Sequence, residues 1–360
     1  MASEMAIEMA NETELEEPTK PRMGPEENTL ILVFDTETTG LPKERSFTES
    51  SDLTKWPSVI QLAWILYDTQ SMNIISSSPQ GEGEDIINNL PDKTTIAFSQ
   101  EGLDINGISE AQIMSSPTTL EMAMDEFIRA YNAAGKIVAH NSTFDVNVMC
   151  AELLRLINNS TMPVEKKQIY QDTYNKLRGG DKPEMDTYKL ATFHCRIWPY
   201  KYAREPSGAI IIDQVTEDDG KTYNTKRKEF FSSAWKAKDP NLEEAHISLF
   251  GQQMYGRPHS ALPDAAECLR IYMRIIHGID ICDGAHPTPG NATICGIINP
   301  GPPLKHKIPR LIESLGGEQA PKKTWKSNSK KGGRKTVKRG KKYSKKYIKK
   351  YSKKRRTIRK

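Results

Sequence analysis

Short apolar runs separated by polar and glycine-containing segments mark the strands that this chain is expected to form. The first run, residues 30–34, is followed by polar residues and Gly40, which predicts a strand buried on both faces. A second strand is predicted over residues 59–67, with a short hairpin partner near residues 73–75. Residues 136–140 predict another short strand.

Helices are predicted where apolar residues recur every three to four positions. One opens near Pro117 and runs through residue 131, and a second is expected to be capped by Ser142 or Thr143. Pro263 suits the first turn of a third helix. The apolar stripes of the three helices are Leu120, Met124, Phe127 and Ile128; Val146, Met149, Leu153, Leu154 and Ile157; and Ala265, Ala266, Leu269, Tyr272, Met273 and Ile276.

Further elements are predicted between these helices. Residues 185–197 suggest a strand end and a helix, and Asp239-Pro240 is expected to cap a helix that Gly251 ends. Residues 164–178 predict an extra polar helix, and residues 208–231 an inserted hairpin with an Asp-Gly turn and a basic end. The insertion is either a structural elaboration or a basic flap that steers single-stranded substrate.

Charge divides the chain into an acidic body and a basic tail. The whole chain has a formal charge of +5, and residues 321–360 contribute +21 without a single acid, so residues 1–320 carry −16. A Lys-Lys-Tyr repeat between residues 341 and 352 predicts disorder in the tail. Nucleic-acid binding, with the tyrosines stacking on bases, and nuclear import through residues 353–356 both fit, either separately or together. A tail that serves only solubility is the remaining alternative.

The expected organisation follows from these patterns. Its parts are a disordered acidic segment (1–28), a domain over 29–280 with insertions near 160–183 and 199–238, a Pro/Gly-rich linker or C-terminal extension (281–320), and the disordered basic tail (321–360). The content of 37% hydrophobic and 27% charged residues is typical of a soluble protein. Since no apolar run approaches a membrane span and the N-terminus does not resemble a signal peptide, we expect an intracellular protein, nuclear or cytoplasmic.

The five cysteines are odd in number and lack C-x-x-C spacing, so reduced thiols are expected. A zinc site formed by His277, Cys282, His286 and Cys295 is the alternative, although their spacing fits no common zinc pattern.

Four acids and one histidine lie at the ends of predicted elements. Asp35 and Glu37 follow the first strand and are two positions apart, which places them on one face. Asp145 and Asp264 each lie in a first helical turn, where an acid commonly interacts with the helix dipole. His259 taken alone suits a surface loop. Four acids in one cleft stay ionised only if cations neutralise them, so together they imply metal ions.

Three motifs in this order resemble the DEDDh family of 3′-to-5′ exonucleases, whose relatives include the proofreading subunit of bacterial DNA polymerase III and ribonuclease T. They are FDTETTG at residues 34–40, VAHNSTFD at 138–145 and HSALPD at 259–264. The resemblance covers residues 28–280 and implies a ribonuclease H-like α/β fold, with a mixed central sheet flanked by helices.

The resemblance also implies roles for individual residues. Asp35, Glu37, Asp145 and Asp264 are expected to bind two Mg²⁺ or Mn²⁺ ions, and His259 to act as the general base. Thr38, Leu41 and Asn141 are assigned to the substrate, and Asp186 to a structural role. Two hard cations about 3.5–4 Å apart can activate water and stabilise the leaving alkoxide, and oxygen ligands select Mg²⁺ or Mn²⁺.

The expected activity is therefore metal-dependent 3′-to-5′ exonucleolytic release of nucleoside monophosphates from DNA or RNA. The main alternative is an inactive nuclease fold that binds or packages nucleic acid through its tail, and an endonuclease is a third hypothesis. The choice between DNA and RNA stays open, because the carboxylates act on the phosphate and not on the sugar. Oligomeric state and biological source, cellular or viral, also stay open.

Overall fold

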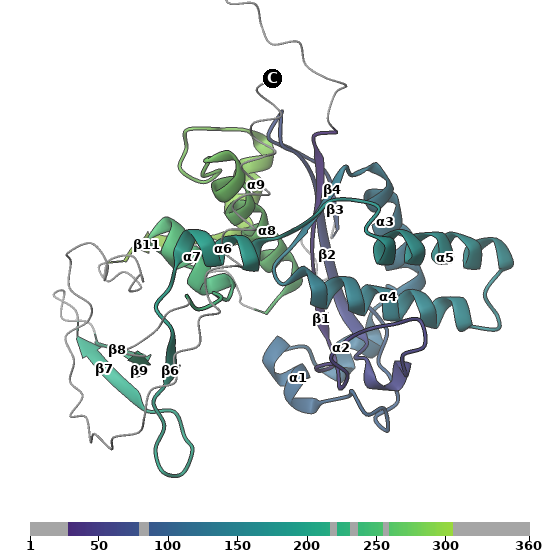
Figure 1. The fold of residues 1–360 in the computed structure, drawn as a ribbon, viewed down its shortest axis with the longest axis horizontal. Helices are drawn as coiled ribbons and strands as arrows, with labels where there is room; N and C mark the ends of the chain where they lie inside the picture. The colour runs from purple at the N-terminus through teal and green to yellow at the C-terminus, as the bar shows by residue number, and fades with distance from the viewer. Residues whose placement is uncertain (1–27, 79–85, 217–221, 231–236, 255–258, 305–360) are drawn as a thin grey trace, which may run out of the picture. The chain divides into compact units, whose positions relative to one another are not determined.

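The computed structural model describes residues 28–78, 86–216, 222–230, 237–254 and 259–304 (Figure 1). All of them belong to the first of the two units into which the chain divides, Met1–Glu318. The predicted disordered N-terminal segment, up to residue 27, and the basic tail lie outside the described residues.

A mixed five-stranded sheet has the strand order β3-β2-β1-β4-β5. The central strand β1 (Leu30–Thr38) runs antiparallel to β2 (Val59–Asp68) and parallel to β4 (Lys136–Ala139). At the edges, β3 (Asn73–Ser78) pairs antiparallel with β2, and β5 (Glu184–Asp186) pairs parallel with β4. The expected α/β fold with a mixed central sheet is confirmed.

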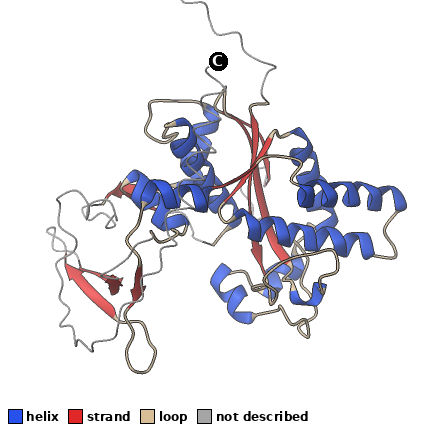
Figure 2. Cartoon of the chain, viewed as in Figure 1, coloured by secondary structure: helices blue, strands red, loops and turns tan. Residues whose placement is uncertain are grey.

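Helices cover both faces of this sheet (Figure 2). On one face lie α3 (Leu120–Ala133) and α4 (Ser142–Asn158), with α5 (Val164–Gly179) packed against α4. On the other face lie α8 (Ala261–Tyr272) and α9 (Pro289–Ile298). The predicted helices near residues 117, 142, 164 and 263 are all present.

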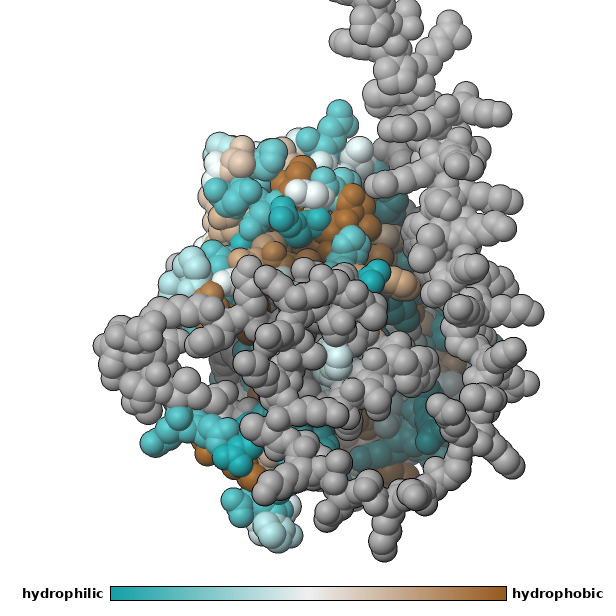
Figure 3. Space-filling view, turned by 60° about the vertical axis from the view of Figure 1, so that its left-hand side comes forward, coloured by the Kyte–Doolittle hydropathy of each residue, from teal (hydrophilic) through white to brown (hydrophobic). Residues whose placement is uncertain are grey.

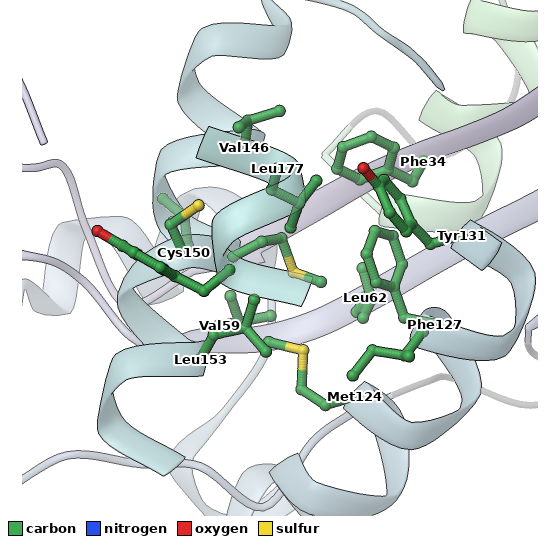
Figure 4. Close-up of a cluster of buried hydrophobic side chains, with 14 of the residues drawn as sticks. Phe34, Val59, Leu62, Met124, Phe127, Tyr131, Val146, Cys150, Leu153 and Leu177 are labelled. Atoms are coloured by element: carbon green, nitrogen blue, oxygen red, sulfur yellow. The ribbon is translucent and has the colours of Figure 1, made fainter. Parts of the chain in front are cut away.

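Successive side chains of β1 contribute to two separate cores. Leu32 and Phe34 pack with α3 and α4, in the core that Figure 4 shows around Phe34 and Phe127. Ile31 and Val33 pack with α8. Because side chains alternate along a strand, Asp35 and Glu37 fall on the α8 side, whereas Thr36 falls on the α4 side.

The remaining elements are short. They are η1 (Leu53–Lys55), α1 (Gln100–Asn106), α2 (Glu110–Ser115), α6 (Thr187–Cys195), β6 (Tyr200–Tyr202), β7 (Ile212–Thr216), β8 (Thr222–Lys226), β9 (Lys228–Phe230), α7 (Leu242–Phe250), β10 (Gln252–Met254), η2 (Met273–His277) and β11 (Pro300–Pro303). The hairpin of β7 and β8 is confirmed, although its predicted Asp219-Gly220 turn lies outside the described residues. The pairing of β6 with β9, and the helices α1, α2 and α9, were not predicted.

Two predicted helix caps are wrong. The N-cap of α4 is Asn141, whereas the Ser142 hydroxyl lies inside the helix and donates to Glu184 on the neighbouring strand β5. The N-cap of α7 is Asn241, which forms a capping box with Glu244. In each case an expected capping side chain contacts a different element. Ser142 contacts β5, and Asp239 accepts a hydrogen bond from Thr192 on α6.

The expectation of reduced thiols is wrong for one pair of cysteines. Cys282 and Cys295 form a disulfide, with Cα atoms 5.5 Å apart. The chain turns back through α9 and brings the two residues together, which spacing alone does not reveal. The zinc alternative fails with it, since a disulfide leaves neither sulfur as a thiolate ligand. The other three cysteines are buried and take no part in this disulfide.

The described surface is mixed in character. On the face drawn in Figure 3, hydrophilic and apolar side chains lie side by side. Some large apolar side chains are well exposed, among them Val164 on α5 and Leu41 after β1. No helix in the described ranges combines the length and the apolarity needed to cross a membrane.

Candidate active site

Two of the predicted acids come from the end of β1. Asp35 lies opposite Ala63 of β2, and Glu37 lies opposite Gln61. Being two residues apart, both side chains point to the α8 side of the sheet. Glu37 is 9% exposed, so its carboxylate is largely removed from water. The strand therefore delivers a pair of acids to one place, as the motif predicts.

The third acid, Asp145, reaches β1 from the first turn of α4. Its Oδ1 accepts two hydrogen bonds from Thr36, one from the backbone N–H at 3.1 Å and one from Oγ1 at 2.8 Å. The carboxylate is buried, with 2% of the residue exposed. Asp145 is thus fixed against the strand that carries Asp35 and Glu37.

The fourth acid and the histidine come from the start of α8. The backbone N–H of Ala261 donates to Gln61 Oε1 at 2.9 Å, which ties this helix start to β2 directly opposite Glu37. One ligand atom each of Glu37, His259 and Asp264 lies within 4.8 Å of the others. Three predicted site residues from two distant segments therefore meet at one point.

Burial raises the pKa of all four carboxyl groups. It raises that of Glu37 to about 8, and repulsion from Asp264 and Asp145 adds to the effect. The pKa of Asp35 lies well above its usual range, from burial first and then from Asp145, Asp264 and Glu37. Burial also raises the pKa of Asp145 and of Asp264, each to about 7. A hydrogen bond from Thr36 partly lowers the first, and one from the His259 backbone partly lowers the second. These groups are close enough for their charges to repel one another, which raises the pKa of Asp35 and of Glu37 further.

The donor set fits a hard divalent cation. Asp264 Oδ1 is buried and has no hydrogen-bond partner among the residues that the structure describes. Both hydrogen bonds from Thr36 end on Asp145 Oδ1, so its Oδ2 is not engaged by Thr36. Carboxylate oxygens are the ligands that Mg²⁺ and Mn²⁺ prefer, and a cation would stabilise the ionised form of every acid in the cluster.

The two motif histidines have different surroundings. His140 Nε2 donates to Pro240 O at 3.1 Å, and its Nδ1 is hydrogen-bonded to Thr187 Oγ1 at 3.0 Å. Burial lowers the pKa of His140 to about 4. His259 is exposed, has a left-handed backbone with φ of 61°, and lies beside Glu37 and Asp264. Of the two, only His259 has the position needed to exchange a proton at the acid cluster.

The residues assigned to the substrate differ in availability. Leu41 is 69% exposed just past the end of β1. Asn141 is also exposed, and its backbone N–H donates to Asp186 Oδ1 at 3.0 Å. Thr38 is buried, and its hydroxyl donates to Gly40 O at 2.7 Å. The Thr38 hydroxyl therefore shapes the turn after β1, which leaves Leu41 and Asn141 as the accessible side chains.

Asp186 has the structural position expected of it. It is the N-cap of α6, where it accepts a hydrogen bond from the Tyr188 backbone, and it forms an ion pair with Lys189 at 2.6 Å.

Three supporting residues were not predicted from sequence. Thr36 holds Asp145, and Gln61 holds the start of α8. Gly40 has a φ of 155°, and a Cβ there would lie 2.6 Å from Ala97 O, so the segment just before α1 approaches the end of β1 this closely only because residue 40 is glycine. A signal existed for one of them: Gln61 is the sole amide in the apolar run of residues 59–67.

A protein-family model matches the part of the chain that contains three of the acids. Residues 32–190 match the RNase T model, whose description is Exonuclease. The match spans 159 of the 360 residues, less than half of the chain. The matched segment contains Asp35, Glu37 and Asp145, whereas His259 and Asp264 lie beyond it.

Solved structures and curated proteins were also compared. The chain is similar to cell-death related nuclease 4 (16% identity, TM-score 0.38, covering 70% of this chain and 65% of that one). It is similar to Exonuclease I from Methylocaldum szegediense (16%, 0.31, 50% and 32%) and to a 3′-exonuclease with 3′-end specific recognition of histone mRNA stem-loop (12%, 0.25, 59% and 74%). It thus spans less than two thirds of the first two. No curated protein matches the chain.

Proposed function

We propose that this protein is a metal-dependent 3′-to-5′ exonuclease that releases nucleoside monophosphates from nucleic acid. The observation that carries the proposal is the meeting of Glu37, His259 and Asp264 within 4.8 Å, next to two further buried acids. The match of residues 32–190 to the Exonuclease model supports the nuclease activity. Direction and product are inferred from the resemblance of the three motifs to DEDDh enzymes.

Each residue has a role in this proposal. Asp35, Glu37, Asp145 and Asp264 would hold two Mg²⁺ or Mn²⁺ ions, which when bound supply Lewis acidity and lower the pKa of water. His259 accepts the proton that the attacking water loses, since its imidazole is exposed and beside Glu37 and Asp264. Leu41 and Asn141 border the position of the terminal nucleotide.

The basic tail is proposed to add affinity for nucleic acid without a part in bond cleavage. It carries +21 on residues 321–360, and each phosphate contact adds about −0.9 for duplex or −0.7 for single strands to the slope of log K against log salt. Truncation after residue 320 should therefore reduce that slope by several units on a long substrate and leave kcat on short oligonucleotides unchanged. Equal slopes would leave nuclear import or solubility as the role of the tail.

One assay tests the activity and its direction. The full chain is incubated with matched 5′-labelled DNA and RNA oligonucleotides, single- and double-stranded, in Mg²⁺, in Mn²⁺ and in chelator. We expect a metal-dependent ladder that shortens from the 3′ end, with mononucleotide product, and we expect circular single strands to resist. An Asp264→Asn protein purified in parallel controls for contaminating nuclease.

Other outcomes have definite meanings. Cleavage of circular strands would indicate an endonuclease. Binding of all substrates without metal-dependent hydrolysis would contradict the proposal and favour a packaging or scaffold protein that acts through its tail.

A further inference from the structure

Thr36 lies between the two acids of β1 but faces away from them. Because side chains alternate along a strand, Asp35 and Glu37 point towards α8, whereas Thr36 points towards α4. There it meets Asp145, which lies 109 positions later in the chain. The residue in the middle of the Asp-Thr-Glu motif is thus in contact with the acid of a different motif.

The contact uses both donors of Thr36 on a single oxygen. Its backbone N–H and its Oγ1 donate to Asp145 Oδ1 at 3.1 Å and 2.8 Å. Two donors on one oxygen fix the position of the carboxylate and leave rotation about its terminal bond little freedom. The bonds are buried, since Thr36 is 5% exposed and Asp145 is 2% exposed, so water does not compete for them.

The start of α4 is anchored by contacts that do not involve Thr36. The N-cap of α4, Asn141, makes no side-chain capping bond within the described part of the helix, and Ser142 donates to Glu184 instead. The start of α4 is therefore held to β5 by Ser142, while the Asp145 side chain itself is held to β1 by Thr36.

We propose that Thr36 is a positioning residue that orients Asp145 for binding a divalent cation. Both Thr36 donors end on Oδ1, so Oδ2 is the oxygen that Thr36 would leave for an ion. The inference rests on the proposed function insofar as Asp145 is a metal ligand, and it goes beyond that function by giving Thr36 a task in metal affinity.

The test compares three variants of the full chain by direct binding of Mn²⁺, followed by electron paramagnetic resonance of the free ion, without nucleic acid. Thr36→Val keeps the shape and the backbone N–H but removes the Oγ1 donor, and Thr36→Ser keeps the donor. Thr173→Val is the control, because Thr173 is equally buried and donates to Ile169 O at 2.9 Å on α5, away from the acids. Thermal unfolding of each metal-free variant is measured in parallel.

We expect Thr36→Val to weaken Mn²⁺ binding about tenfold or more, which is typical when a group that orients a metal ligand is lost. Thr36→Ser should bind within about threefold of the original protein, as should Thr173→Val, even though the latter also loses a buried hydrogen bond. If Thr36→Val fails to fold, Thr36→Ala replaces it with the same expectation.

Two results would overturn the inference. One is Mn²⁺ affinity in folded Thr36→Val equal to that of the original protein, which would make the contact a purely structural one. The other is a Thr36→Ser affinity as low as that of Thr36→Val, since the hydroxyl would then not be the cause. The fate of the proposed function is read separately, from hydrolysis by the original protein: hydrolysis with unchanged Thr36→Val affinity removes only the role of Thr36. Absence of Mn²⁺ binding in the original protein would remove both.

Discussion

Two segments of this protein carry the same His-x-x-x-x-Asp spacing and use it differently. His140 and Asp145 lie on either side of the start of α4, and His259 and Asp264 on either side of the start of α8. In both, the helix that follows places the aspartate in its first turn and directs it to the sheet. The two aspartates therefore reach the same cluster, each with a pKa raised to about 7 by burial.

The histidines do not share this outcome. His140 is enclosed between β4 and α6, with hydrogen bonds at both ring nitrogens, and its pKa is lowered to about 4. His259 is exposed at the rim of the cluster. Equal spacing thus places each aspartate in the first turn of a helix that begins at the acid cluster. The environment of each histidine comes from elements that the spacing does not describe.

The largest predicted effect tests whether the aspartates are equivalent. Asp145→Asn and Asp264→Asn should each lower kcat/KM by about 10³-fold, or about 4 kcal/mol, because each removes an anionic metal ligand. Steady-state kinetics on a labelled single strand at saturating Mn²⁺ measures this. Asp172→Asn, which changes an exposed acid on α5, is the control. A loss below tenfold in either folded variant would break the equivalence and exclude that residue as a ligand.

The histidines should differ in the next largest effect. His259→Asn should lower kcat by about 10²–10⁴ and flatten the acidic limb of the pH profile, since the general base is lost. In His140→Asn the folded protein should retain most of its kcat and the same pH profile, because among the described residues the ring nitrogens of His140 are hydrogen-bonded to Thr187 and Pro240 and not to the acids. Single-turnover rates from pH 5 to 9 decide the matter. The same pH profile in His259→Asn and the original protein would assign the base elsewhere.

A smaller effect is expected from the residue that anchors the second segment. Gln61→Met should lower kcat about tenfold, because the start of α8, and with it His259 and Asp264, loses its bond to β2. Mn²⁺ affinity should fall as well, whereas Asp145 keeps its bonds to Thr36. Gln61→Glu keeps an acceptor oxygen for the Ala261 N–H and should recover part of the rate. Full activity in Gln61→Met would show that packing alone holds this segment.

The smallest predicted effect concerns stability between pH 6.5 and 8. The folded protein holds protons on carboxyl groups with pKa values of about 7 to 8, whereas the unfolded chain has already released them. The metal-free free energy of unfolding should therefore fall as pH rises through this window. Mn²⁺ should remove the fall, and Asp264→Asn should lessen it. Urea unfolding at each pH is the measurement, and a rise in metal-free stability towards pH 8 contradicts the assigned cluster.

Below about pH 6.5, His140 in the first segment changes the free energy of unfolding in the opposite direction. His140 has a folded-state pKa of about 4, below the ordinary value of 6.5, so protonation favours the unfolded chain. The contribution of neutral His140 to the free energy of unfolding is complete above about pH 6.5 and is lost as the pH falls towards 4. The loss of stability between those values should be shallower in His140→Asn than in His259→Asn. Identical slopes in the two variants would show that the burial of His140 has no such consequence.

Much of the architecture follows from local pattern. The run of residues 30–34 predicts a strand buried on both faces, and β1 has that environment. The prediction is possible because an apolar run is a property of residues that are neighbours in the sequence. The polar helix over residues 164–178 is predicted correctly for the same reason and ends at Gly180 with φ of 66°. The spacing of Asp35 and Glu37 likewise settles that they share a face of the sheet.

Only the tertiary structure decides the contacts between distant segments. Thr36 meets Asp145 across 109 positions, and Gln61 meets Ala261 across 200. The disulfide of Cys282 forms because the chain returns through α9. Ser142 does not cap α4, because its hydroxyl is hydrogen-bonded to Glu184 on β5. Sequence alone thus determines the main strands and helices around the site, and the acids at their ends, because these depend on neighbours along the chain. Packing decides which histidine is exposed and which uncharged residues hold the acids, because burial and hydrogen-bond partners come from segments that are adjacent only after folding.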